Sequence, residues 1–106
     1  MNPQMKKGVI ELCIMKIIDL KKSSTYEILN QIHSLKVNEN TIYPILRRLN
    51  KEGYLDQEKG NNAVGAPRKY YKLTKLGEQK LVEHITAWED FSNSVEKILK
   101  GEINNE

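Results

Sequence analysis

The stretch NENTIYPILRRLNKEGYL, residues 38–55, is the most informative part of this sequence. Its apolar residues recur at helical spacing, which predicts a helix with one buried face formed by Ile42, Ile45, Leu46 and Leu49. Asn38 or Asn40 can cap the start of this helix, and Gly53 can end it. At 100° per residue, the opposite face carries Asn40, Pro44, Arg47 and Lys51, flanked by Thr41, Tyr43 and Arg48.

The residue types on this outer face are those that bind DNA. Arginine donates two hydrogen bonds to guanine, and asparagine pairs in the same way with adenine. Lysine and arginine also neutralise phosphates, which gives affinity without sequence preference. For a helix considered alone, an ordinary solvated face is the more common explanation, so the neighbouring elements decide the interpretation.

A basic hairpin is expected directly after this helix. Residues 54–59 and 69–73 are strand candidates, and residues 60–67 between them are rich in turn formers. Arg68, Lys69 and Lys72 add positive charge to the hairpin. A polar, basic helix followed by a basic hairpin is typical of a winged helix-turn-helix. The predicted DNA-binding residues are Asn38, Asn40, Thr41, Tyr43, Pro44, Arg47, Arg48, Lys51, Arg68 and Lys69.

Two further helices are expected before the stretch at 38–55. Residues 7–20 are apolar on nearly every side, so this helix is either the centre of the core or partly covered by a second subunit. The sequence Ser24-Thr25-Tyr26-Glu27 has the spacing of a capping box and predicts a helix over residues 25–35. The chain therefore has the helix order that a winged helix-turn-helix requires.

A long helix over residues 75–100, capped by Thr74 and ended by Gly101, completes the chain. Its apolar residues alternate at spacings of four and three, with Ser92 in the one polar place, as in a heptad seam. Val82, Phe91 and Ile98 widen the seam. Its partner is the chain's own first helix, a second subunit, or both. We predict a homodimer whose interface contains Val9, Leu12, Leu81, Ile85, Trp88, Val95 and Leu99.

These motifs resemble those of PadR-type transcriptional regulators. Residues 38–55 resemble the recognition-helix signature of the family, and PRKYYKLTKLG, residues 67–77, resembles its second wing strand and the start of its dimerisation helix. STYEI at 24–28 and GVIELCIMKII at 8–18 match the second and first helices, although Thr25 stands where many members carry glycine. The resemblance covers residues 7 to about 100.

The resemblance implies a dimer built from the first and last helices that represses a promoter with a two-fold related operator. A single C-terminal helix is typical of the short subfamily. In its multidrug-responsive members a tryptophan stacks flat aromatic ligands, and Trp88 stands at the matching place. This implies an effector site at Trp88 and Phe91, with Ile14 and Met15 nearby, and the adjacent Glu89 and Asp90 would favour a cationic ligand. Alternatively, Trp88 only packs in the dimer core.

Charge and composition agree with a nucleic-acid partner. Residues 36–75 hold nine Lys or Arg and four acids, whereas residues 76–106 hold three Lys and seven acids. A basic centre favours a polyanionic partner, here double-stranded DNA. We therefore expect a winged helix-turn-helix domain over residues 1–74 and a dimerisation helix and tail over residues 75–106. The fold class is mainly α with a small β-hairpin.

Other functional classes find less support in the sequence. Cys13, His33 and His84 are isolated from one another, and no metal-ligand spacing, serine nucleophile motif or phosphate-binding loop is present. We therefore expect neither an enzyme nor a cofactor or metal site. The absence of a long apolar run or signal peptide predicts a cytoplasmic protein without membrane contact. The alternative function is a winged-helix protein-interaction module without an operator, but such a module would not need basic residues on both helix and hairpin.

Overall fold

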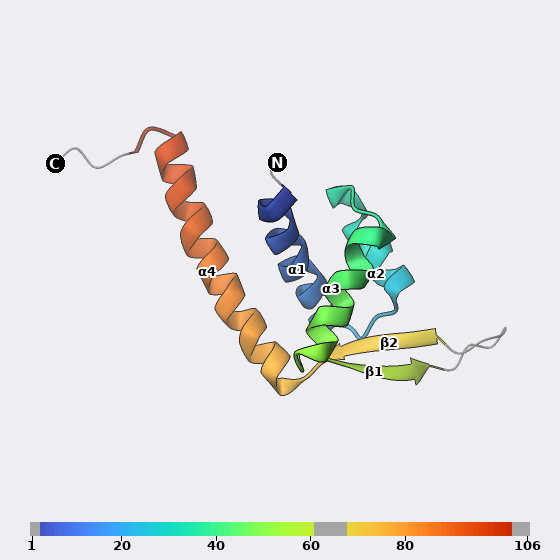
Figure 1. Ribbon diagram of the computed structural model, residues 1–106. Coiled ribbons are helices and arrows are strands. Elements are labelled where there is room, and N and C mark those ends of the chain that lie inside the picture. Colours follow the sequence, from blue (N-terminus) through green and yellow to red (C-terminus); the bar gives the residue numbers. More distant parts are fainter. Residues whose placement is uncertain (1–2, 61–67, 103–106) are drawn as a thin grey trace.

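The computed structural model describes residues 3–60 and 68–102, with side chains from residue 8 onward. In chain order the elements are α1 (Pro3–Leu20), α2 (Thr25–Ile32), the short 3₁₀ helix η1 (His33–Leu35), α3 (Glu39–Lys51), β1 (Leu55–Gly60), β2 (Arg68–Leu73) and α4 (Lys75–Leu99). This arrangement confirms the predicted fold class, a winged helix-turn-helix with a long C-terminal helix (Figure 1). Of the loop predicted over residues 60–67, Gly60 belongs to β1, and residues 61–67 lie outside the described residues.

Local signals set the ends of α3. The side-chain oxygen of Asn38 accepts a hydrogen bond of 2.9 Å from the amide of Asn40, so Asn38 is the cap and Glu39 the first helical residue. Pro44 therefore lies inside the helix, and because it has no amide hydrogen the carbonyl of Asn40 loses its usual partner within the helix. At the other end Gly53 takes a left-handed conformation, with φ at +85°, that turns the chain into β1.

Two predicted boundaries differ from the structure. The helix expected over residues 25–35 ends at Ile32, and its last turn tightens into the 3₁₀ helix η1 before Lys36 turns the chain with a φ of 57°. α1 begins at Pro3, earlier than the predicted residue 7. The strands pair antiparallel, from Leu55 opposite Leu73 to Gly60 opposite Arg68, close to the predicted hairpin.

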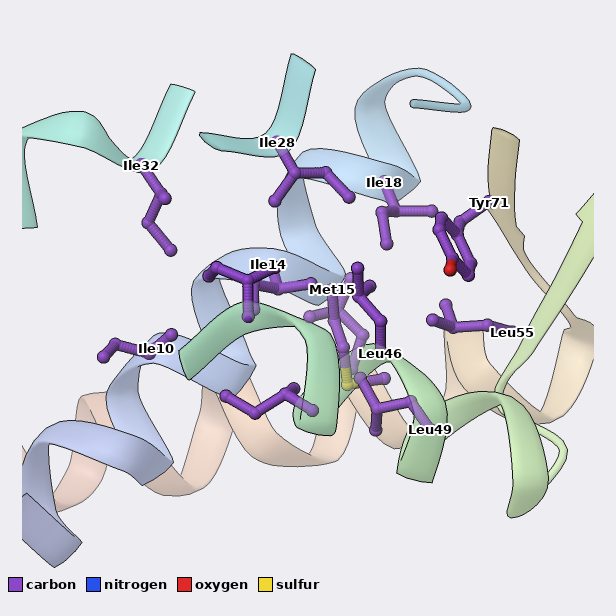
Figure 2. Close-up of a cluster of buried hydrophobic side chains, with 13 residues drawn as sticks. Ile10, Ile14, Met15, Ile18, Ile28, Ile32, Leu46, Leu49, Leu55 and Tyr71 are labelled. Carbon is purple, nitrogen blue, oxygen red and sulfur yellow. The ribbon is translucent and has the colours of Figure 1, made fainter. Parts of the chain in front are cut away.

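The core lies between α1, α2, α3 and the base of the hairpin (Figure 2). Its buried hydrophobic side chains are Ile10, Ile14, Met15, Ile18, Ile28, Ile32, Ile42, Ile45, Leu46, Leu49, Leu55, Tyr71 and Leu81. The four residues predicted for the buried face of α3 are all among them. A stripe of this kind turns the opposite face of α3 toward solvent.

Three residues predicted for the effector site or the dimer interface belong to this core instead. Ile14 and Met15 are fully buried inside the single chain, and Leu81 is only 3% exposed. The reason is that α1 is apolar on two sides. One side packs on α2 and α3, and the other faces α4, so Ile14 and Met15 cannot approach a ligand beside Trp88. Leu81 lies in the first half of α4, which packs back onto the same domain.

α4 starts in close contact with the domain and then leaves it (Figure 1). The Thr74 hydroxyl oxygen caps the helix by accepting a hydrogen bond of 3.0 Å from the amide of Gly77, as predicted. A Cβ on Gly77 would overlap the carbonyl oxygen of Tyr54, so glycine permits the close approach of α4 to the chain before β1. Beyond Ile85 the helix extends away, which gives the chain a longest dimension of 64 Å.

Candidate nucleic-acid interface

The outer stripe of α3 is exposed as predicted. Asn40, Pro44, Arg47 and Lys51 are all exposed and lie opposite the buried stripe of the same helix. Among the described residues, no carboxylate pairs with Arg47 or Lys51 within 4.0 Å. Both side chains are therefore available to a partner.

A hollow of about 520 Å³ lies beside this stripe, between α3, the start of α2 and the hairpin. Its lining residues are Ser24, Thr25, Tyr26, Tyr43, Arg47, Gln57, Arg68, Lys69 and Tyr71. Three of them are cationic, and none of the described residues that line it is acidic. The hollow thus joins Tyr43 and Arg47 of the recognition stripe to Arg68 and Lys69 of the hairpin in one concave, positively charged surface.

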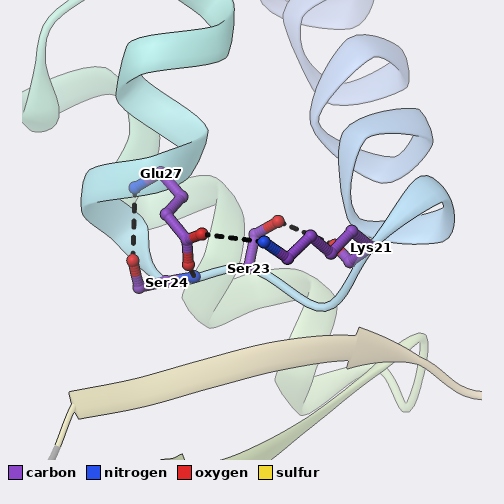
Figure 3. A network of polar contacts seen from close by, with 4 residues as sticks. All are labelled: Lys21, Ser23, Ser24 and Glu27. Atoms are coloured by element: carbon purple, nitrogen blue, oxygen red, sulfur yellow. Dashed lines mark hydrogen bonds and ion pairs between the residues drawn. The ribbon is translucent and has the colours of Figure 1, made fainter. Parts of the chain in front are cut away.

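The start of α2 borders this hollow, and Figure 3 shows the polar contacts that cap the helix there. The predicted capping box is formed: the Ser24 hydroxyl oxygen accepts from the amide of Glu27 at 3.2 Å, and the Glu27 carboxylate accepts from the amide of Ser24 at 3.1 Å. These two bonds satisfy the backbone amides of Ser24 and Glu27. The amides of Thr25 and Tyr26 have no partner within the helix. The hydrogen bond from Ser24, with a smaller contribution from Lys21, holds the pKa of Glu27 below its usual value.

The hairpin is fixed to the segment between α1 and α2. Ser23 and Tyr71 exchange two backbone hydrogen bonds of 3.0 and 2.8 Å, which add a one-residue third strand to the sheet. Lys22 Nζ donates a hydrogen bond of 2.7 Å to Glu58 Oε1, and Lys72 Nζ lies 3.7 Å from Glu58 Oε2. The bond from Lys22 lowers the pKa of Glu58. The bridge and the bond from Lys22 attach the hairpin to the segment that leads into α2.

Arg68 stacks on α2 in addition to lying on the hairpin. Its guanidinium carbon lies 5.6 Å from the centre of the Tyr26 ring, within the range of a cation–π contact. The contact leaves the edge of the guanidinium free to donate hydrogen bonds. Lys69, the next residue, is exposed.

Arg48 is placed differently from the other predicted DNA-binding residues. One nitrogen of its guanidinium bonds the carboxylate of Glu11 on α1, and the other lies 3.4 Å from Glu52 Oε1. Because Arg48 follows Arg47 directly, it lies about 100° around the helix, on the side that faces α1. The structure thus separates two adjacent arginines that sequence reasoning had placed together.

Several residues of the concave surface were not predicted from the sequence. Thr25, Tyr26, Gln57 and Tyr71 belong to elements that flank α3, and only the folded chain brings them beside Arg47. The bridge from Ser23 to Tyr71 connects residues 48 positions apart, and no local pattern indicates such a contact. Only the alternation of side chains along β2 could have indicated that Tyr71 points inward. Tyr71 is buried between exposed Lys72 and half-buried Tyr70.

A second feature is an apolar groove of about 660 Å³ between α1 and the outer half of α4. Its lining residues are Gly8, Val9, Leu12, His84, Ala87, Trp88, Phe91, Ser92, Val95, Glu96 and Leu99. Five of the seven residues predicted for the dimer interface line it, and Ile85 lies beside the core instead. Trp88 is 42% exposed and Leu99 is 80% exposed in the single chain. The carboxylate in the lining is Glu96, not the predicted Glu89 or Asp90.

Other kinds of site receive no support from the described residues. They contain no cluster of three or more His, Cys, Asp or Glu side chains that could hold a metal ion. None of their helices is long and apolar enough to cross a membrane. Burial raises the pKa of the Cys13 thiol, which disfavours the reactive thiolate form.

Comparison with known proteins agrees with this geometry. The family model for the transcriptional regulator PadR-like family matches residues 14–83, which include the whole recognition helix and hairpin. The chain belongs to the PadR-like family. Members of this family are DNA-binding transcriptional regulators and not enzymes, which confirms both predictions.

Solved structures of similar proteins share the whole architecture. A protein of Streptococcus mutans UA159 is 34% identical, with a TM-score of 0.86 over 94% of each chain. A PadR-like transcriptional regulator of Bacillus cereus strain ATCC 14579 is 35% identical, with a TM-score of 0.83 over 91% of this chain and 96% of that one. A PadR-like transcription factor of Bacteroides fragilis is 36% identical, with a TM-score of 0.76 over 90% of this chain and 94% of that one.

Proposed function

We propose that this PadR-like regulator binds a two-fold related operator as a homodimer and represses the promoter that contains it. The observation that carries the proposal is the continuous surface formed by the outer stripe of α3, the concave hollow and the hairpin. Arg47, Lys51, Arg68 and Lys69 lie on it, and none of these four cations pairs with a described carboxylate within 4.0 Å. A surface of this kind fits the major groove and the two phosphate backbones that border it.

The surface has separate parts for bases and phosphates. Asn40, Arg47 and Lys51 project from α3 and would read base edges in the major groove. Arg68 and Lys69 on the hairpin would bind phosphates of the flanking backbone. The two free amides at the start of α2 would donate to a phosphate in the hollow.

The apolar groove supports the homodimer. The groove is lined mainly by apolar side chains, and a second apolar surface could bury them. Leu99 and Phe91 are mostly exposed in the single chain, and a second copy related by a two-fold axis would cover them with the same groove. Residues 75–106 would thus form the dimerisation segment and residues 1–74 the DNA-binding domain. The two α3 helices would then lie about 34–36 Å apart, one turn of B-DNA.

The same groove supports release by a small aromatic effector. Trp88 offers a large flat face at the groove, and the half-exposed ring leaves room for a stacked ligand. Glu96 in the lining would favour a ligand with positive charge, which also gains from cation–π contact with Trp88. The ligand would release DNA only if it binds one spacing of the two DNA-binding domains more tightly than the other.

The DNA part is tested with single substitutions on the proposed surface. Arg47→Ala and Lys51→Ala should each weaken binding to operator duplex, by about 1–3 kcal/mol for a base contact, without loss of folding. Lys97→Ala removes one charge from α4, far from this surface, and is the matched control. If Arg47→Ala and Lys51→Ala bind as tightly as Lys97→Ala, the proposed surface is wrong.

The effector part is tested by titrating planar cationic dyes and phenolic acids while Trp88 fluorescence is followed, since the chain has one tryptophan. We expect quenching by at least one compound and a matching release of labelled DNA. The Leu99→Asp variant, which should not dimerise, is the control and should lose the quenching. If no compound in a broad panel quenches the wild type, Trp88 serves only to pack the dimer.

A further inference from the structure

Two adjacent arginines on α3 have different surroundings. Arg47 points into the concave hollow and has no ion-pair partner within 4.0 Å among the described residues. Arg48 bonds Glu11 on α1 and also lies within 3.4 Å of Glu52. The side chain of Glu11 is only 18% exposed, so this pair is better shielded from water and salt than the other ion pairs of the chain. With carboxylates on two sides, Arg48 contributes little positive charge toward DNA.

Glu11 belongs to α1, which lines the apolar groove on one side and packs in the core on the other. Its neighbour Leu12 lines the apolar groove, whereas its other neighbour Ile10 is buried in the core beneath α3. The bond from Glu11 to Arg48 therefore joins the helix of the proposed dimer groove directly to the recognition helix. The bond to Glu52 holds the guanidinium in place at the C-terminal end of α3. Arginine can bond two carboxylates at once because its donors form a planar fork.

We propose that Arg48 is a positioning residue, which sets the angle of the recognition helix relative to α1 through Glu11, and is not a DNA contact. The proposal rests on the proposed DNA-binding function. It assigns the two arginines opposite roles: Arg47 binds DNA, and Arg48 holds α3 in the orientation in which Arg47 reaches it. It also places Glu11, an acidic residue distant from the DNA surface, among the residues on which DNA affinity depends.

The test measures operator affinity as a function of salt for wild type, Arg47→Met, Lys69→Met, Arg48→Met, Glu11→Gln and the double variant of Glu11 and Arg48. Arg47→Met should weaken binding tenfold or more because a base contact is lost. Lys69→Met removes a proposed phosphate contact and should reduce the salt slope by about two, because each substitution occurs twice in a dimer. Arg48→Met and Glu11→Gln should each weaken binding severalfold and leave the salt slope unchanged. The double variant should bind no more weakly than Arg48→Met alone.

The sign of the Glu11→Gln effect separates the two roles of Arg48. If Arg48 contacts phosphate, Glu11→Gln frees its charge and strengthens binding, and Arg48→Met reduces the salt slope as Lys69→Met does. Either result would overturn the proposal. A merely stabilising ion pair would change the unfolding midpoint but not the affinity of the folded protein, so equal affinity at a temperature where all variants are folded would also overturn it.

A second arm does not depend on DNA. Wild type and the three variants of Glu11 and Arg48 are unfolded in urea, and the two single effects are compared with that of the double variant. We expect the double variant to lose less stability than the two single variants combined. Additive effects would show that the two side chains do not interact in solution, and the proposal would fail. If instead the chain binds no duplex while these effects are non-additive, the proposed function fails and the link between α1 and α3 remains.

Discussion

Leu81 and Leu99 occupy the same seam of α4, yet replacement by alanine should affect different properties at the two positions: the stability of the single chain at Leu81 and the association of two chains at Leu99. They are 18 residues apart, which is five full helical turns, so they project from the helix in the same direction. Leu81 is 3% exposed inside the single chain, whereas Leu99 is 80% exposed. Leu81→Ala therefore tests the fold of one chain, and Leu99→Ala tests the contact between two chains.

The expected magnitudes follow from these exposures. Leu81→Ala removes a fully packed side chain and should lower the free energy of unfolding by about 2–5 kcal/mol. Leu99→Ala should leave the single chain nearly unchanged. Full burial of a leucine contributes about 1.5–3 kcal/mol, and most of the surface of Leu99 remains to be covered, so each chain should lose about 1–2 kcal/mol of association energy. Two chains lose about 2–4 kcal/mol, a rise of roughly 30- to 1,000-fold in the dimer Kd.

Two measurements on both variants decide the outcome. Sedimentation over a range of concentrations gives the dimer Kd, and urea unfolding at a fixed high concentration gives the stability, because the stability of a dimer depends on concentration. Leu81→Ala should have a lower urea midpoint than Leu99→Ala. The Leu99→Ala dimer should dissociate at a higher protein concentration than the wild-type dimer. If Leu99→Ala dimerises as tightly as wild type, the groove is not the dimer interface. If Leu81→Ala unfolds like wild type, the inner half of α4 is not part of the core.

Three further predictions concern single features of the fold. Gly77→Ala places a Cβ against the carbonyl of Tyr54 and should cost about 1–3 kcal/mol of stability, seen as a lower urea midpoint; an unchanged midpoint would contradict the close approach. The pKa of Glu27 is lowered in the folded chain by its bond from Ser24, so its contribution is present above the ordinary value of 4.5 and is lost as pH falls through the folded value. The stability difference between wild type and Glu27→Gln should therefore shrink in acid, whereas a constant difference would exclude this titration. Dilution below the dimer Kd should shift Trp88 emission to the red, and constant emission would argue against its burial in a dimer.

The recognition helix and the hairpin were predictable because their signals are local. An apolar stripe of period 3.6, an asparagine cap and a glycine stop are all contained in residues 38–55, and the structure places each as expected. The capping box of α2 and the Thr74 cap of α4 were predictable for the same reason. Local signals fix which face of a helix is buried, and the exposed stripe then follows.

The sequence did not predict which element packs against a given apolar side chain, or which residue pairs with a given charged one. The heptad seam of α4 looks uniform in sequence, but its inner end packs on the same chain and its outer end does not, so Leu81 was assigned to the wrong surface. Ile14 and Met15 were misplaced because α1 is apolar on both sides, and sequence does not say which side faces α4. Arg48 was grouped with Arg47 because its partner Glu11 lies 37 residues away.

The most direct measurement is the binding of labelled duplex from the region upstream of this chain's own gene, at several salt concentrations and with the stoichiometry determined. Saturation at two chains per site, with an affinity that falls steeply as salt rises, is the expected result. Arg47→Ala should bind more weakly at every salt concentration while Lys97→Ala binds like wild type. Equal binding of both variants, or an affinity insensitive to salt, would contradict the assignment of α3 and the hairpin as the DNA-binding surface.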